Sequence, residues 1–260
     1  MPRAPDPFKP PPDANFTKGE INRAGQLLER FYFTPREPDA DIFEGFDANE
    51  LVDGMYAITW WKQQHARSLS QVAASLRYHV LKEDGEVNGR IDVAQRLKKR
   101  DTIIDKLHRF EKMKLTQMHD IGGVRATLPS LACVSAVSRR LRKNWTIART
   151  RDYIAEPKTS GYRAIHHDVV RSGVVIEIQL RTVRQHAWAN QVEDDGRRLG
   201  TGYKFGFGTS EVHDYYRIVG NAFYLLDRGE DLPEPLLEDL RSAYAKIQPI
   251  LRPDDSRSRK

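Results

Sequence analysis

Two short strand patterns within residues 166–181 constrain the fold of the whole chain. Residues 166–170 and 174–181 are separated only by Arg171-Ser172-Gly173, and a three-residue connection that contains glycine favours an antiparallel hairpin. Alternation along the second run puts Glu177, Gln179 and Arg181 on one face and only apolar residues on the other. The apolar face requires a covering layer. The polar face is either solvated or the floor of a polar site.

Helical patterns before and after this hairpin supply the covering layers. Apolar residues at helical spacing predict helices around 21–31 and at 48–66, 69–81, 102–114, 129–143, 182–194, 212–229 and 234–250. Further strands are predicted at 123–128 and 145–148, with loops at 83–89 and 196–208. The predicted fold class is therefore α+β, with a small mixed sheet flanked by N- and C-terminal helices.

The ends of the chain differ in composition from its middle. Residues 1–16 contain six prolines and few groups that could pack, which predicts a disordered arm. We expect a single domain over residues 17–250 and a disordered tail at 251–260. The single cysteine, Cys133, excludes an intrachain disulfide. No apolar leader or membrane-length apolar run is evident, so we expect a cytoplasmic protein with no membrane partner.

Positive charge is concentrated in one part of the chain. The net charge is +6, yet residues 96–151 carry 15 Lys/Arg against 4 Asp/Glu, a local +11. A concentrated basic block indicates an anionic partner, such as nucleotide phosphates, RNA or DNA. The alternative is a solvated basic surface without a ligand.

Two polar segments fall within or beside this block. Arg96, Lys98 and Lys106 can converge on one anion if Thr102 caps the helix that follows. Asp120 precedes a strand, next to two glycines that allow close backbone approach, and its carboxylate is a hard oxygen ligand suited to Mg²⁺. Taken singly, a solvated helix start and an Asp-Gly turn are the better explanations of these two segments.

Two more polar segments lie in and around the hairpin. Lys158, Tyr162 and His166 recur at four-residue spacing and offer an ammonium, a stacking ring and an imidazole, a set that suits a nucleotide. The fourth segment is the polar face of the strand with Glu177, followed by His186 on the next helix.

Together these segments resemble the synthetase domain of the RelA/SpoT family, which transfers pyrophosphate from ATP to a ribose 3′-hydroxyl. The matching stretches are RLKKRDTIIDKL, HDIGGVRATL, DYIAEPKTSGYRAIHHDV and IEIQLRTVRQHAWA, in the family's order. They cover about residues 96 to 189, within a motif core of 96–205. The resemblance implies a nucleotidyltransferase-like sheet, ATP as donor and Mg²⁺ as cofactor.

The resemblance also implies roles for individual residues. Asp120 is the metal-binding aspartate, and Glu177 assists the metal or acts as base on the 3′-hydroxyl; both are the catalytic and metal candidates. Tyr162 stacks on the acceptor base. The ATP-binding candidates are Arg96, Lys98, Thr102, Lys106, Arg125, Gln179 and Arg181, of which the last two can also face the acceptor. The remaining acceptor-side candidates are Lys158, His166 and His186.

The identity of the acceptor stays open at this stage. A chain of 260 residues has no room for the hydrolase and regulatory domains of the family's long members, so it resembles a single-domain small alarmone synthetase. Its residues 185–206 are closer to a toxin-like branch. The basic block slightly favours the tRNA 3′-CCA end over GDP/GTP or adenine nucleotides. An antitoxin partner is possible, the oligomeric state is undetermined, and the alternative from another class is a non-catalytic RNA-binding relative.

Overall fold

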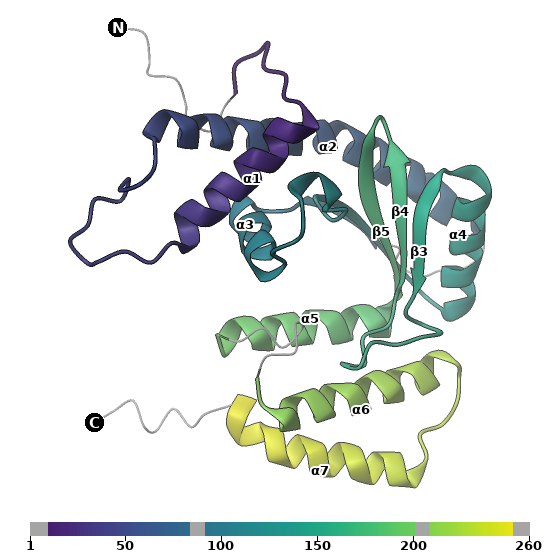
Figure 1. Ribbon diagram of the computed structural model, residues 1–260. Helices are drawn as coiled ribbons and strands as arrows, with labels where there is room; N and C mark the ends of the chain where they lie inside the picture. Colours follow the sequence, from purple (N-terminus) through teal and green to yellow (C-terminus); the bar gives the residue numbers. More distant parts are fainter. Residues whose placement is uncertain (1–9, 84–91, 201–207, 252–260) are drawn as a thin grey trace, which may run out of the picture.

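The computed structural model describes residues 10–83, 92–200 and 208–251, which form a five-stranded sheet with helices on both sides (Figure 1). The strands lie in the order β1-β2-β5-β4-β3. Their bounds are Asp92–Leu97 (β1), Gly122–Leu128 (β2), Ile147–Asp152 (β3), Ile165–Arg171 (β4) and Val174–Thr182 (β5). The helices are α1 (Lys18–Phe33), α2 (Ala48–Glu83), α3 (Arg100–Arg109), α4 (Leu131–Asn144), α5 (Val183–Arg198), α6 (Ser210–Asp227) and α7 (Glu234–Leu251).

The sheet is mixed, as the sequence predicts. Strands β4 and β5 form the expected antiparallel hairpin, and β1–β2 and β3–β4 are also antiparallel. The pair β2–β5 is parallel, with Gly123 opposite Glu177 and Arg125 opposite Gln179. This parallel pair joins two segments about fifty residues apart in the chain, so the sheet is completed only when the whole motif region has folded.

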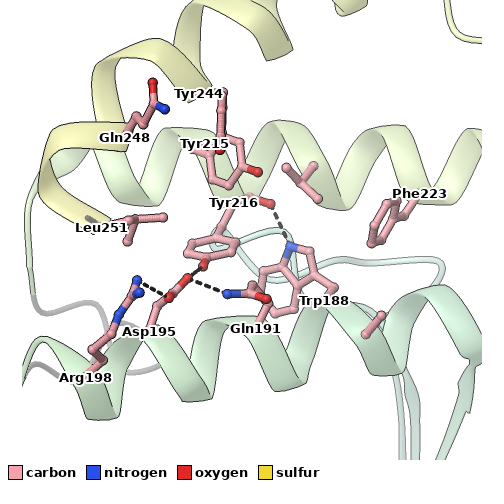
Figure 2. A pocket seen from close by; sticks show the side chains of 12 residues that line it. Trp188, Gln191, Asp195, Arg198, Tyr215, Tyr216, Phe223, Tyr244, Gln248 and Leu251 are labelled. Atoms are coloured by element: carbon pink, nitrogen blue, oxygen red, sulfur yellow. Dashed lines mark hydrogen bonds and ion pairs between the residues drawn. The ribbon is translucent and has the colours of Figure 1, made fainter.

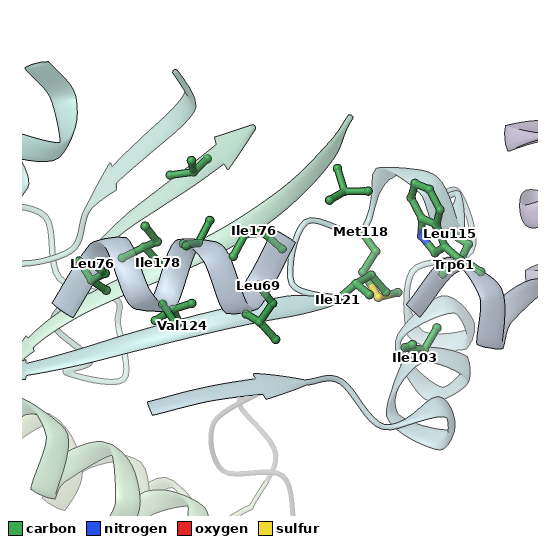
Figure 3. Packing of buried hydrophobic residues seen from close by; sticks show 14 of the residues in the cluster. Trp61, Leu69, Leu76, Ile103, Leu115, Met118, Ile121, Val124, Ile176 and Ile178 are labelled. Carbon is green, nitrogen blue, oxygen red and sulfur yellow. The ribbon is translucent and has the colours of Figure 1, made fainter. Parts of the chain in front are cut away.

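One long helix covers the apolar face of the sheet. Helix α2 is 36 residues long and packs Leu69 and Leu76 against the face that carries Val124, Ile176 and Ile178 (Figure 3). The prediction of two helices at 48–66 and 69–81 is wrong, because no glycine or proline interrupts the pattern between them. Instead, buried Ser68 donates its hydroxyl to the carbonyl of Arg171, 3.2 Å away.

The structure corrects several other boundaries. The sequence analysis does not predict β1, a strand at the sheet edge in which half of the residues are polar. Strand β3 begins at Ile147 rather than Trp145, which is the C-cap of α4. Helix α3 ends at Arg109 instead of about 114. Within the predicted N-terminal arm, Phe16 packs edge-on against Trp60, with ring centroids 5.8 Å apart. Most of the predicted arm, tail and two loops lie outside the described residues.

Helices α5, α6 and α7 form a layer of their own below the sheet in Figure 1. Their core contains Trp188, Val192, Val212, Tyr216 and Ile247. Figure 2 shows how polar contacts complete this core: the Trp188 indole N–H donates to the carbonyl of Tyr216 at 2.7 Å, and the Tyr216 hydroxyl donates to Asp195. A pocket of about 400 Å³ remains among the three helices.

Two glycines join this helical layer to the loop that follows β3. A Cβ added to Gly220 would lie 2.4 Å from the carbonyl oxygen of Gly161, and one added to Gly161 would lie 2.8 Å from Cα of Arg217. Gly161 also has φ +89°, a conformation that favours glycine. Only residues without a Cβ allow this backbone contact, which holds the loop directly before Tyr162.

We expect Gly220→Ala to destabilise the protein, although alanine is the better helix former. The gain of about 1 kcal/mol in helix propensity is outweighed by the clash with backbone atoms that have no room to move. The matched control is Gly54→Ala in α2, where the new Cβ meets its nearest neighbour at an ordinary 3.6 Å. Thermal unfolding should show a lower Tm for the first variant and an equal or higher Tm for the second. A raised Tm for both would refute the close contact.

Candidate functional site

The face of the sheet opposite α2 carries a continuous set of polar side chains. Alternation within each strand and the register between strands place these residues in rows that run across the sheet. The central row runs from Arg125 through Gln179 and His166 to Arg151, and a flanking row contains Glu177 and Asp168. The residues between them, Ile176, Ile178 and Leu180, are fully buried on the other face. The polar face of β5 is thus part of a site rather than a solvated surface, because Glu177 and Arg181 are themselves buried.

Glu177 is held by three donors from three positions on this face. Its Oε1 accepts from His166 Nδ1 at 2.9 Å and from Arg151 at 3.2 Å, and its Oε2 accepts from Gln179 at 2.7 Å. Burial alone raises the pKa of this carboxyl. The hydrogen bond from His166, together with the hydrogen bond from Gln179 and the charge of Arg151, outweighs burial and lowers the pKa of Glu177 to about 2. Glu177 is therefore a fixed negative charge at neutral pH and a weak base.

A hydrogen-bond chain continues from His166 to Arg181. Because Nδ1 of His166 donates to a carboxylate, its Nε2 accepts from the Tyr162 hydroxyl at 2.6 Å. The same hydroxyl oxygen accepts from Arg181 at 2.7 Å. Burial lowers the pKa of His166 and raises that of Tyr162, so the histidine stays neutral and the phenol stays protonated at pH 7.

The ring of Tyr162 already has cationic neighbours. The Lys158 ammonium lies 5.2 Å from the ring centroid and the Arg181 guanidinium 5.0 Å. Its ring also packs at a tilt against Trp188 of α5, with the two ring centroids 6.0 Å apart. The arrangement is compatible with stacking on an aromatic base only if the base takes the place of one of these neighbours.

The second carboxylate, Asp120, is bound by two lysines. Lys98 Nζ lies 3.0 Å from its Oδ2 and Lys106 Nζ 2.8 Å from its Oδ1. Burial raises the pKa of Asp120, but the two ammonium groups outweigh burial and lower it overall. Three predicted residues from three separate segments thus meet at one point: the end of β1, helix α3 and the turn before β2.

The charge of Lys158 is influenced by residues of both carboxylate clusters. Partial burial lowers the pKa of Lys158. The negative charge of Glu177 raises this pKa, whereas the nearby positive charges lower it further; these are Arg151, Arg181 and Lys106. These charges are close enough to influence one another, so the Asp120 and Glu177 clusters face a common region. That region has cations from four elements and two ionised carboxylates, which suits a polyphosphate bound together with a divalent cation.

Three residues of the site are absent from the sequence prediction. Asp168, with no exposed surface, accepts from Arg151 at 2.5 Å and from His119 Nδ1 at 2.9 Å. Arg151 therefore bridges Asp168 and Glu177, while His119 directly precedes Asp120 in the chain. A signal was available: Asp168 follows His166 by two residues in a strand, so the two share a face.

Other predicted residues have different surroundings from those expected. Thr102 does not cap α3, because that helix begins at Arg100, with Lys99 as N-cap, and Thr102 is exposed in its first turn. Arg96 is exposed on β1, opposite Gly123. Arg125 pairs with Asp92 at 3.4 Å. Burial lowers the pKa of His186, and the charges of Arg125 and Arg181 lower it further. Gly122, expected to approach a ligand, is instead covered by Ile176 of the core.

The protein side chains alone provide only part of the ligands that a Mg²⁺ ion requires. Among the described residues, no group of three or more His, Cys, Asp or Glu side chains could hold a metal ion. Magnesium, however, is commonly bound by one or two carboxylates together with substrate phosphates and water. Asp120 and Glu177, both ionised and both facing the cationic region, fit that arrangement.

Comparison with known proteins identifies the region that builds this site. Residues 95–196 match the family described as "Region found in RelA / SpoT proteins". The chain is 36% identical over 109 residues to GTP pyrophosphokinase YjbM, and 31% identical over 111 residues to GTP pyrophosphokinase YwaC, both of Bacillus subtilis (strain 168). These matches cover 37% and 36% of this chain and 52% of each relative, so the chain spans about half the length of the curated relatives it matches.

Solved structures show the same fold. The small alarmone synthetase 1 from Bacillus subtilis bound to its product pppGpp is 25% identical, with a TM-score of 0.56 over 65% of this chain and 94% of that chain. The small alarmone synthetase 2 from the same organism is 22% identical, with a TM-score of 0.52 over 65% of this chain and 95% of that chain. The α+β fold and mixed sheet expected from the sequence are thereby confirmed. None of the helices in the described residues is long and apolar enough to cross a membrane.

We expect Asp168→Asn to destabilise the protein by about 3 kcal/mol, because it removes the buried counter-charge of Arg151. The matched control is Asp214→Asn, which removes an exposed Asp–Arg pair with Arg217 and should cost less than about 1 kcal/mol. Urea unfolding of both variants measures the difference. Equal, small losses would show that Asp168 does not anchor the site.

The contribution of Glu177 should depend on pH in a defined window. Its folded-state pKa is depressed from 4.5 to about 2, so the stabilisation is present above about pH 4.5 and is lost as the pH falls towards 2. At pH 7, Glu177→Gln should therefore lower the free energy of unfolding by on the order of 3 kcal/mol. The difference in unfolding free energy from the wild type should disappear as the pH falls from 5 to 2. Exposed Glu238→Gln is the control and should give no such pH-dependent gap. If urea unfolding shows the same difference in unfolding free energy between Glu177→Gln and the wild type throughout this pH range, the lowered pKa of Glu177 is wrong.

Proposed function

Since residues 95–196 form a RelA/SpoT-family region, we propose that this protein is an ATP-dependent pyrophosphotransferase. It moves the β,γ-pyrophosphate of ATP to a ribose 3′-hydroxyl. The observation that carries the proposal is the pair of ionised carboxylates, Asp120 and Glu177, each in contact with cationic side chains: Lys98 and Lys106 for the first and Arg151 for the second. A site that only bound anions would gain nothing from two negative charges, because they repel phosphate unless a metal intervenes.

The reaction forms a bond between the acceptor 3′-oxygen and the β-phosphorus of ATP, and the proton of the 3′-hydroxyl leaves to water. The bond from that phosphorus to the oxygen bridging to the α-phosphate breaks, and AMP leaves with the electron pair. Negative charge shifts among the phosphate oxygens during this transfer, so cations fixed beforehand stabilise the transition state. We assign this role to Lys98, Lys106, Lys158 and Arg181, with Arg96 and Arg125 at the rim.

A bound Mg²⁺ would supply positive charge that neutralises part of the negative charge on the phosphates. Asp120 and Glu177 are the residues that would hold it. Asp120 must exchange its lysine partners for this purpose, and the released ammonium groups are then available to phosphate oxygens. Without a ligand, the two lysines are therefore the counter-charges of Asp120. With ATP bound, they contact its phosphates.

For Glu177 we favour a metal-holding and orienting role over that of general base. A carboxylate with a pKa near 2 is a poor acceptor for the proton of a hydroxyl. Its oxygens are also engaged by His166, Arg151 and Gln179. Binding of the acceptor would need to remove at least one of these donors before Glu177 could accept a proton.

We propose GDP or GTP as the first choice of acceptor, which would make the product an alarmone, ppGpp or pppGpp. The support is that the similar proteins YjbM and YwaC are named GTP pyrophosphokinases. Tyr162 would stack on the base, and His166 and His186 would lie on the acceptor side. An adenine nucleotide is compatible with the same ring, because stacking distinguishes bases weakly.

The tRNA 3′-CCA end is the second candidate acceptor. The observation that favours it is the local charge of +11 over residues 96–151, which exceeds what one nucleotide requires. On this alternative the protein would be a toxin that stops translation, and an antitoxin protein would be its partner.

The test is transfer of label from ATP labelled on the γ-phosphate, with Mg²⁺ and one acceptor at a time. Label in ppGpp or pppGpp identifies the alarmone synthetase, and label on deacylated tRNA identifies the toxin. Asp120→Asn and Glu177→Gln should each lower transfer at least about a hundredfold, whereas Asp214→Asn should not. Absence of transfer to GDP, GTP, ATP and tRNA, with tRNA still bound, would identify a non-catalytic RNA-binding relative instead.

A further inference from the structure

The pocket among α5, α6 and α7 has the size of a small-molecule site. Its volume is about 400 Å³, within the range of about 300–1,000 Å³ that is typical of ligand pockets. Each helix contributes residues spaced three or four apart, such as Trp188, Gln191 and Asp195 of α5, so one face of each helix lines the pocket. None of the described residues that line it belongs to the Asp120 or Glu177 cluster.

Aromatic rings form much of the wall of this pocket. The rings of Trp188, Tyr216, Tyr215 and Tyr244 contact one another in that order, with centroids 5.9, 5.3 and 6.0 Å apart. The series crosses from α5 over α6 to α7, and Figure 2 shows the rings gathered between these helices. The interplanar angles are 80°, 64° and 45°. Because no pair in the series is stacked face to face, a flat molecule can stack on the ring faces that the protein leaves open.

The described lining of the pocket carries no unpaired charge. Asp195 and Arg198 are its only charged residues, and they pair at 2.7 Å. The carboxylate of Asp195 also accepts from the Tyr216 hydroxyl and, at 2.9 Å, from the Gln191 amide. Both oxygens of Asp195 are therefore engaged. A charged ligand would lose its water without gaining a counter-charge, so the pocket favours an uncharged one.

Two polar groups of the lining are available to a ligand. The Tyr215 hydroxyl and the Gln248 amide have no hydrogen-bond partner within residues 10–83, 92–200 and 208–251. A phenol hydroxyl can donate or accept, and an amide offers a donor and an acceptor. A few polar groups set among apolar walls are the usual means by which a pocket orients its ligand.

We infer that this pocket binds an uncharged, planar aromatic molecule, which stacks on the rings between Trp188 and Tyr244 and accepts a hydrogen bond from the Tyr215 hydroxyl. Trp188 also packs against Tyr162, with ring centroids 6.0 Å apart, so the ligand contacts a neighbour of that ring from outside the catalytic face. The inference concerns binding alone and does not rest on the proposed function.

The first test is titration with Nile red, an uncharged planar dye whose fluorescence rises in apolar surroundings. We expect saturable binding of one dye per chain. Val219→Trp fills the pocket with a further indole and should weaken binding at least about tenfold. The matched control is Leu81→Trp, which adds the same ring to α2 at a side chain that is 65% exposed and should leave Kd unchanged. Circular dichroism melts verify that both variants are folded.

A milder variant tests the hydrogen bond. Tyr215→Phe keeps the ring and removes only the hydroxyl, which can donate to the carbonyl oxygen of the dye. Loss of one such hydrogen bond should raise Kd about two- to tenfold. The matched control is Tyr78→Phe on α2, where the tyrosine is 55% exposed and the change should have no effect.

Three competitors test the chemical class of the ligand. 2-Naphthol should displace the dye. Its saturated counterpart, decahydro-2-naphthol, and the anionic 2-naphthalenesulfonate should require concentrations at least about tenfold higher. The inference is overturned if the dye does not bind, if either pocket variant binds it like the wild type, or if the saturated or anionic competitor acts as well as 2-naphthol. Dye binding that weakens as the protein concentration rises would show that a second copy covers the pocket, and would also overturn the inference.

Discussion

The parallel pairing of β2 with β5 is the constraint on which the rest of the structure depends. It brings the segment after Asp120 beside the strand that carries Glu177, with Gly123 opposite Glu177. A shift of one residue would turn Glu177 and Gln179 into the core and Ile176 and Ile178 out of it. The register is fixed because α2 buries the apolar face, so the same hydrophobic contacts that stabilise the sheet also orient the site.

Charge compensation is the second condition for this site. The two carboxylates are ionised although largely buried, because each has cationic or hydrogen-bond partners: Lys98 and Lys106 for Asp120, and His166, Arg151 and Gln179 for Glu177. Arg151 is in turn balanced by Asp168, and Asp168 is contacted by His119. The chain of pairs runs from Glu177 through Arg151 and Asp168 to His119, which directly precedes Asp120. A ligand with its own charges would exchange partners within this network without creating an unpaired buried charge.

The helical layer of α5, α6 and α7 supports the site from one side. Trp188 contacts Tyr162, and Gly220 contacts Gly161 of the loop directly before it. This layer therefore helps to position the Tyr162 ring while remaining a core of its own.

The sequence by itself determined the strands with the strongest alternation, the hairpin, most of the helices and the two carboxylates. Those features depend on local periodicity and on short motifs, which can be read within about twenty residues. It did not reveal β1, whose polar residues pair at an edge, or the continuity of α2 through Arg67 and Ser68. Nor did it reveal Asp168 and Arg151 as partners of Glu177, because the pairing of β3, β4 and β5 brings them together. Only the tertiary structure decided which charges neutralise one another, since ion pairing depends on distance in space and not on separation along the chain.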